Sequence, residues 1–164
     1  MIYLIADTHF GHKNIIEYED RPFDNIDDMD SELIKKWNSV VDENDLVYHL
    51  GDVFLCNTDR QFKIFNQLNG TIHLIRGNHD KQTKTKLVDR LGFESVRGQY
   101  QHKGMLLTHK PKEDTGIFNI HGHSHSRRKK DASHFCVSVE ENNYTPVSFR
   151  RILTYKHAQY FNFR

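Results

Sequence analysis

The sequence contains few of the residues that mark secreted or membrane proteins. Only two of its 164 residues are cysteines, Cys56 and Cys136, which form neither a CxxC pair nor a disulfide framework. Both lie in or beside apolar segments and are expected to be buried thiols. No apolar run approaches the roughly 20 residues that a membrane-spanning helix needs. The N-terminus lacks the basic segment and cleavage site of a signal peptide, so we expect a soluble, cytoplasmic protein.

The net charge is also close to zero, because the sequence has 23 basic and 22 acidic residues. A formal charge of +1 therefore gives no indication of a nucleic-acid or membrane partner. Low-complexity segments, repeats and linkers are lacking too, which predicts a single domain over residues 1–164. Histidine, in contrast, is abundant, with 12 copies. It is the commonest metal ligand and the side chain that titrates near neutral pH.

The first half of the chain alternates between strand and helix patterns. Continuous apolar runs at 2–6, 46–50 and 71–75 predict strands that are buried on both faces. Helical spacing follows each of them, after Asp28, from Thr58 and over 83–91. This order indicates a parallel sheet covered by helices.

The second half favours strands separated by turn residues, and predicts a second sheet that is antiparallel or mixed. Its strand candidates are 93–102, 104–108, 117–120 and 134–139. After Pro146 the pattern leaves strand and helix both open.

Five of the apolar runs end in carboxylate, amide or imidazole side chains. These ends are Asp7-Thr8-His9, Gly51-Asp52, Gly77-Asn78-His79-Asp80, His109 and Gly122-His123-Ser124-His125. Ligands of α/β sheets bind beyond the carboxyl ends of strands, so these groups should converge in one crevice. Such ligands without thiolate suit divalent manganese, iron, nickel or zinc. These candidates outnumber the ligands of one tetrahedral site and fit two metals that share a carboxylate.

In this order the five motifs resemble the signature of calcineurin-like metallophosphoesterases, and the match runs from residue 7 to 125. The sequence around 7–16, 21–23 and 137–146 is similar to a small single-domain branch of bacteria and their phages. The resemblance implies an α/β fold, a four-layer α/β/β/α sandwich of two mixed sheets flanked by helices. It also implies a dinuclear metal-dependent phosphoric ester hydrolase.

The resemblance assigns a role to each motif residue. It implies that the first metal is held by Asp7, His9 and His125, the second by Asn78, His109 and His123, with Asp52 bridging. A metal-bridging hydroxide would then attack phosphorus in line, with manganese as the expected metal and iron, nickel or zinc as alternatives. It places His79 at the leaving oxygen as a catalytic residue, held by Asp80.

The expected substrate is a small, nucleotide-like or other phosphodiester. Gly51-Asp52 runs into Val53-Phe54-Leu55-Cys56, so the clamp arginines of phosphoprotein phosphatases cannot be mapped. A small domain without a cap leaves the site open, which a diester tolerates. A phosphomonoesterase or a nuclease is the alternative within hydrolases. A non-catalytic interaction module is disfavoured because every ligand and His79 are present.

Four further residues are candidates for substrate contact. They are His12, Asn14, Arg21 and Arg127. Arg127 opens the basic run 127–130, which is either a solvated loop or an anion-attracting rim and is the only support for nucleic acid. We expect no membrane partner, and the oligomeric state stays open.

Overall fold

The computed structural model describes residues 1–127 and 131–162, with side chains through residue 159. The rest of the basic run, 128–130, lies outside the described residues. Within the described part of the chain, no helix is long and apolar enough to cross a bilayer.

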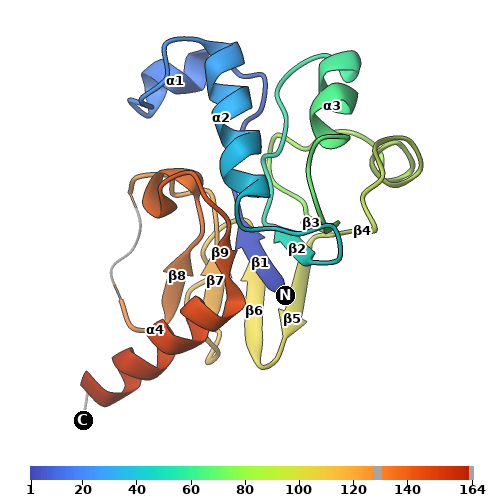
Figure 1. Ribbon diagram of the computed structural model, residues 1–164. Coiled ribbons are helices and arrows are strands. Elements are labelled where there is room, and N and C mark those ends of the chain that lie inside the picture. Colours follow the sequence, from blue (N-terminus) through green and yellow to red (C-terminus); the bar gives the residue numbers. More distant parts are fainter. Residues whose placement is uncertain (128–130, 163–164) are drawn as a thin grey trace.

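Two sheets form the centre of the fold (Figure 1). The first has the strand order β4-β3-β2-β1-β9 and the second the order β5-β6-β7-β8. The first sheet contains β1 (Ile2–Ile5), β2 (Leu46–His49), β3 (Thr71–Ile75), β4 (Ser95–Arg97) and β9 (Val147–Ser148). Its first four strands are parallel, and β9 pairs antiparallel with β1.

The second sheet is mixed as well. It contains β5 (Gln99–His102), β6 (Met105–Thr108), β7 (Asn119–His121) and β8 (His134–Cys136). The β5–β6 pair is antiparallel, whereas β6, β7 and β8 are parallel.

The helices begin and end where local chemistry allows it. They are α1 (Asn14–Tyr18), α2 (Ile26–Asn38), α3 (Thr58–Phe65), the π-helical η1 (Lys86–Leu91), the 3₁₀ turn η2 (Val139–Asn142) and α4 (Phe149–Asn162). The Asn25 side chain caps α2, and the Asn57 side chain caps α3. The helix expected over 83–91 is shorter and ends at Gly92, whose left-handed φ of 101° closes it.

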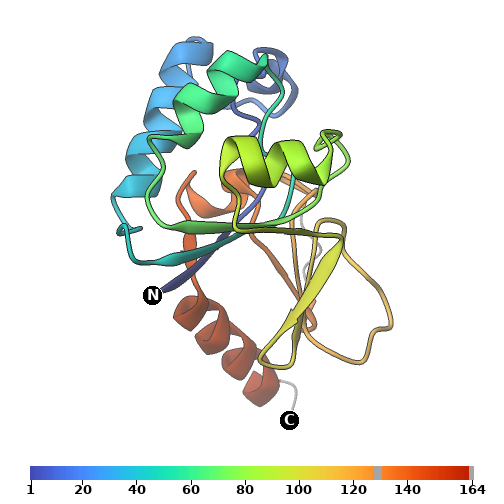
Figure 2. The same cartoon turned by 90° about the vertical axis from the view of Figure 1, so that its right-hand side faces the viewer.

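The strands β1 and β2 are buried on both faces because alternate residues enter different cores. In β1, Tyr3 and Ile5 join a core with Trp37 of α2, while Leu4 joins a core with Leu107 of the second sheet. Figure 2 shows α2, α3 and η1 on one side of the first sheet and α4 at the opposite end of the molecule. The predicted architecture of two mixed sheets flanked by helices is therefore confirmed.

The single strand expected over 93–102 is wrong in one respect. Gly98 divides it, so that β4 pairs with β3 in the first sheet and β5 pairs with β6 in the second. The segment thus carries the chain from one sheet to the other. The segment after Pro146, left open between strand and helix, contains the short β9 and then α4.

The two sheets are joined directly beside the predicted ligands. Ala6 N–H donates to Val137 O at 2.9 Å, and Val139 N–H donates to Ala6 O at 3.1 Å. This bridge places the segment after β8 next to the loop after β1. Ser138 and Glu140 are thereby brought to Asp7 and His125.

Candidate metal centre

The seven predicted ligands converge at the carboxyl ends of β1, β2, β3, β6 and β7. Two groups could each hold a metal ion, Asp7 with His9 and His125, and Asp52 with His109 and His123. Within each group the ligand atoms lie within 4.8 Å of one another. Asn78 joins the second group, since its Oδ1 lies 2.9 Å from His109 Nε2.

Asp52 lies between the two groups. Its Oδ2 is 3.7 Å from His9 Nε2 in one group and 3.5 Å from His109 Nε2 in the other. Its Oδ1 accepts the His79 backbone N–H at 2.8 Å, which fixes the carboxylate. One oxygen is thus held by the main chain while the other faces both groups.

The backbone that presents these ligands is strained. Five of the seven have a left-handed φ between 47° and 66°, namely Asp7, His9, Asp52, His123 and His125. Such conformations are uncommon outside glycine and cluster at functional sites. The sharp turns direct consecutive polar side chains toward one point.

Two glycines allow the loops to approach each other. A Cβ at Gly77 would overlap Asp52 Oδ1 and the Asp52 backbone nitrogen. A Cβ at Gly122 would overlap the Cβ of Ala6 and lie 2.8 Å from Asp7 Oδ2. Both positions therefore require glycine if the ligands are to meet.

The first group fits a divalent cation because three of its buried polar atoms have no hydrogen-bond partner. Asp7 Oδ1 and both ring nitrogens of His9 are buried without a hydrogen bond. Burial lowers the pKa of His9 to about 2, which keeps the imidazole neutral, the form that binds metals. Burial likewise raises the pKa of Asp7 to about 6, so its buried carboxylate needs a cation to be stable.

The second group fits a divalent cation equally well. His109 Nδ1 donates to Leu50 O at 2.8 Å, which leaves Nε2 as an acceptor. The Nδ1 of His123 lies only 3.1 Å from that nitrogen. Burial lowers the pKa of His123 to about 4, so both rings present lone pairs to the same point.

A second layer of polar residues supports the first group. The Ser138 hydroxyl donates to Asp7 Oδ2 at 2.6 Å, and His125 Nδ1 donates to Glu140 Oε1 at 2.9 Å. Such contacts orient metal ligands. The sequence interpretation did not assign roles to Ser138 and Glu140, although they follow a strand as the ligands do.

His79 lies at the open side of the centre. Its side chain is 42% exposed, and its Nε2 is 3.9 Å from Asp52 Oδ2. Asp80 is expected to hold the His79 side chain, but in the structure its carboxylate binds backbone N–H groups. Its carboxylate accepts the backbone N–H groups of Asp52, Gly77 and Val53 at 2.8, 2.8 and 3.1 Å. Asp80 therefore ties together the loops after β2 and β3.

Replacing Asp80 by asparagine is expected to lower the free energy of unfolding by about 2–3 kcal/mol. The amide cannot accept three N–H bonds, and a buried unsatisfied donor costs about 1–3 kcal/mol. Urea unfolding of the metal-free protein measures this. The exposed His79→Asn variant, as a control, should stay within about 0.5 kcal/mol of wild type. Wild-type stability of D80N would contradict this structural role.

The four candidates for substrate contact lie in different surroundings. His12 is half-buried at the rim, with its ring centroid 5.8 Å from that of His9. The exposed Asn14 donates its amide to Tyr18 Oη at 3.5 Å. Arg127 is exposed and pairs with Glu19 at 2.9 Å.

Arg21 is placed where it cannot contact substrate. Its guanidinium is fully buried and donates to the carbonyls of Asp7 and Thr8 at 2.7 and 2.9 Å. It also pairs with Glu140 at 2.6 Å. The expected substrate contact is therefore wrong, and Arg21 instead holds the loop that carries Asp7.

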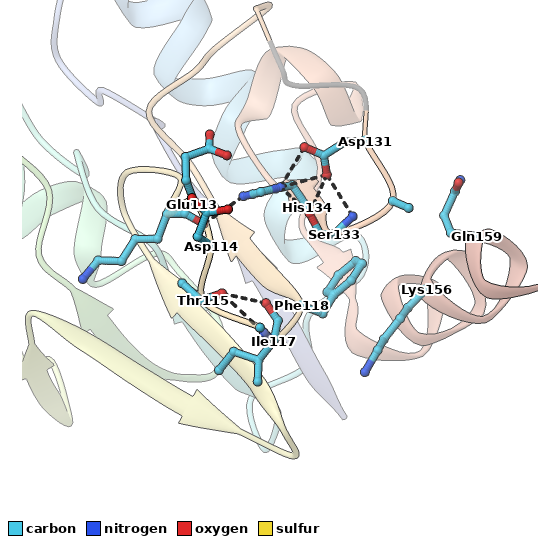
Figure 3. Close-up of a pocket in the computed structure, with 13 residues that line it drawn as sticks. Glu113, Asp114, Thr115, Ile117, Phe118, Asp131, Ser133, His134, Lys156 and Gln159 are labelled. Carbon is cyan, nitrogen blue, oxygen red and sulfur yellow. Dashed lines mark hydrogen bonds and ion pairs between the residues drawn. The ribbon is translucent and has the colours of Figure 1, made fainter. Parts of the chain in front are cut away.

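A separate cavity of about 840 Å³ lies away from these ligands (Figure 3). It is lined by the segment 112–118, by Ser133 and His134, and by Lys156 of α4. His134 pairs with Asn119 at the start of β7, whereas the predicted ligands His123 and His125 follow the end of that strand. None of the seven predicted ligands lines this cavity.

Comparisons with known proteins agree with this site. The calcineurin-like phosphoesterase superfamily domain matches residues 1–142. An uncharacterized protein of Methanocaldococcus jannaschii is 38% identical over 166 residues, covering 93% of this chain and 89% of that protein. The Gene 66 protein of Mycobacterium phage L5 is 30% identical over 157 residues, covering 74% of this chain and 75% of the phage protein.

Two solved structures share the fold. A protein of unknown function from Aquifex aeolicus has a TM-score of 0.72 at 26% identity, covering 94% of this chain and 98% of its own. The Pseudomonas putida nuclease MPE has a TM-score of 0.57 at 20% identity, covering 76% of this chain and 61% of its own, and this likeness shows the fold alone. Since the matched residues 1–142 include both ligand groups, the chain belongs to the calcineurin-like phosphoesterase superfamily, as a metal-dependent phosphoester hydrolase.

Proposed function

We propose that this chain is a dinuclear phosphodiesterase, acting on nucleotide-like or other small phosphodiesters with manganese as the preferred ion. The observation that carries the proposal is the position of Asp52 Oδ2 between two ligand groups, with the exposed His79 Nε2 at 3.9 Å. Asp7, His9 and His125 would hold one ion and Asn78, His109 and His123 the other, with Asp52 shared. Two ions held in this way supply an activated water and neutralise phosphoryl oxygens.

The preference for a diester is supported by how the arginines near the ligands are used. Arg21 is bonded to the carbonyls of Asp7 and Thr8, and Arg76 to those of Asp80 and Gln82. Both are thus occupied in holding loops. A monoester carries one more negative charge than a diester and would gain most from such a clamp.

The proposed preference is tested by comparing bis(4-nitrophenyl) phosphate with 4-nitrophenyl phosphate in the presence of manganese. We expect a higher kcat/KM for the diester, because Arg21 and Arg76 are bonded to backbone carbonyls and so do not clamp the additional charge of a monoester. A strong preference for the monoester would reject the diesterase assignment and leave the phosphomonoesterase alternative.

His79 is proposed to donate a proton to the leaving oxygen. Its backbone N–H is anchored on Asp52, and its ring projects toward solvent beside the ligand groups. A positioned acid of this kind contributes about 10²–10⁴-fold to the rate. Asp80 assists indirectly, since it fixes the loop from which His79 projects.

His79→Asn is expected to lower kcat by about 10²–10⁴-fold for a diester with an alkoxide leaving group. The loss should be much smaller for a 4-nitrophenolate leaving group, which departs without a proton. The difference is measured by steady-state rates on two phosphodiesters, one with a methyl and one with a 4-nitrophenyl leaving group. The metal content of each protein is measured in parallel. Equal losses on both substrates would contradict the role in protonation.

A further inference from the structure

A row of histidine and tyrosine rings extends from the candidate metal centre to the surface. The ring centroids of His9 and His79 are 5.5 Å apart, and those of His9 and His12 are 5.8 Å apart. The Tyr18 ring follows at 6.2 Å from His12, at an interplanar angle of 75°. The exposure of the side chains increases outward along this row, from the buried His9 through the half-buried His12 to the exposed Tyr18.

The exposure of Tyr18 is not explained by packing. Among the residues whose side chains are described, Tyr18 is one of four large hydrophobic residues that are exposed, at 66%. The apolar contact of α1 with the core is made by Ile15, which is buried. An exposed large aromatic residue beside a reactive centre is more informative than one elsewhere on the surface.

The segment that carries Tyr18 is anchored on both sides. Asn14 donates to its hydroxyl at 3.5 Å. Glu19, the next residue, accepts from Ser126 at 3.0 Å and from Arg127 at 2.9 Å. These bonds tie α1 to the loop that follows His125. The segment that carries the ring is therefore tied to the loop that bears the Arg127 guanidinium and follows the predicted ligand His125.

We propose that Tyr18 is a stacking platform for a nucleobase of the substrate, which makes the substrate class nucleotide phosphodiesters. This inference rests on the proposed function. Proteins bind unpaired nucleotides by combining aromatic faces, on which bases stack, with cations that attract the backbone. Tyr18 and Arg127 supply this combination. Arg127 also pairs with Glu19, which offsets the charge of that carboxylate.

The spacing agrees with such a substrate. A strand advances about 3.4 Å per nucleotide in duplex geometry and further when extended. The two ring-to-ring steps of 5.8 and 6.2 Å from His9 to Tyr18 therefore place the platform within reach of a nucleotide flanking the scissile phosphate. A base there would stack on Tyr18 while the phosphodiester lies at the ligand groups.

The test compares Tyr18→Ala, Tyr18→Phe and Phe62→Ala on a thymidine dinucleotide and on its abasic analogue with the same phosphodiester. Phe62 is an exposed aromatic residue on α3 and serves as the matched control. Y18A should raise KM for the dinucleotide about tenfold and leave the abasic analogue unchanged, since one base–aromatic stack is worth about that factor. Y18F and F62A should resemble wild type on both substrates.

A binding measurement separates this inference from the proposed function. Fluorescence polarisation with a labelled oligothymidylate should show the same tenfold loss in Y18A, whether or not cleavage occurs. If wild type binds in this way but hydrolyses neither compound, the platform stands and the diesterase proposal falls. Suppose that wild type hydrolyses both compounds, and that Y18A changes KM equally for both or for neither of them. The platform is then wrong and the diesterase proposal stands.

Discussion

Asp52→Asn is expected to lower kcat at least about a thousandfold, which corresponds to roughly 4 kcal/mol of transition-state stabilisation. Asp52 faces both ligand groups through its Oδ2. In the variant the remaining oxygen can still accept the His79 N–H, so an amide NH₂ would replace Oδ2. A donor without charge then points at the place where a cation is needed.

The metal content should fall together with the rate. Elemental analysis after dialysis against manganese is expected to give close to two ions per chain for wild type and fewer for D52N. Asp89→Asn, an exposed carboxylate on η1, is the control and should change neither quantity. A D52N protein with a full metal complement and a wild-type kcat would show that the two groups act independently of Asp52.

Glu140→Ala is expected to reduce the free energy of unfolding by about 3–5 kcal/mol, because it leaves the buried Arg21 guanidinium without its counter-ion. Burial by itself would raise the pKa of Glu140. The bond to His125 and the charges of Arg21 and His125 outweigh it and hold the pKa below the usual value. The carboxylate is therefore ionised at neutral pH, and its Oε1 accepts from both Arg21 and His125.

Denaturant unfolding of the metal-free protein measures this effect, and Glu43→Gln, at an exposed position, serves as the control. A double-mutant cycle separates the pair from its surroundings. Arg21→Met combined with E140A should cost less than the sum of the two single changes, since neither charge is then left alone. Additive losses would mean that Arg21 and Glu140 stabilise the loop separately. In metal titrations, E140A should also bind about 10–100-fold more weakly, because His125 loses its orienting partner.

The convergence of the seven candidate ligands could be predicted from the sequence because each of them follows a strand at its carboxyl end. In a parallel sheet this position alone brings side chains together. The same rule points to Ser138 and Glu140 after β8, yet they were identified only in the structure. Their roles depend on the Ala6 bridge between the sheets, which no local pattern indicates.

Long-range partners explain the errors. Asp80 is adjacent to His79 in sequence, but its carboxylate turns to Asp52 and Val53, 28 and 27 residues away. Arg21 was predicted to contact substrate because an arginine side chain commonly pairs with an anion. In the structure that anion is the Glu140 carboxylate, 119 residues further along the chain. The division of 93–102 into β4 and β5 likewise follows from pairing with two different sheets, which single-strand propensity does not determine.

The bridge at Ala6 has a consequence for how the protein folds. The centre takes ligands from residue 7 to residue 125 and support from residue 140, so no partly folded fragment holds it complete. Pairings of such wide sequence separation form late and slowly. Metal affinity should consequently emerge only in the last kinetic phase of refolding, and an ion added earlier would leave the preceding phases unchanged.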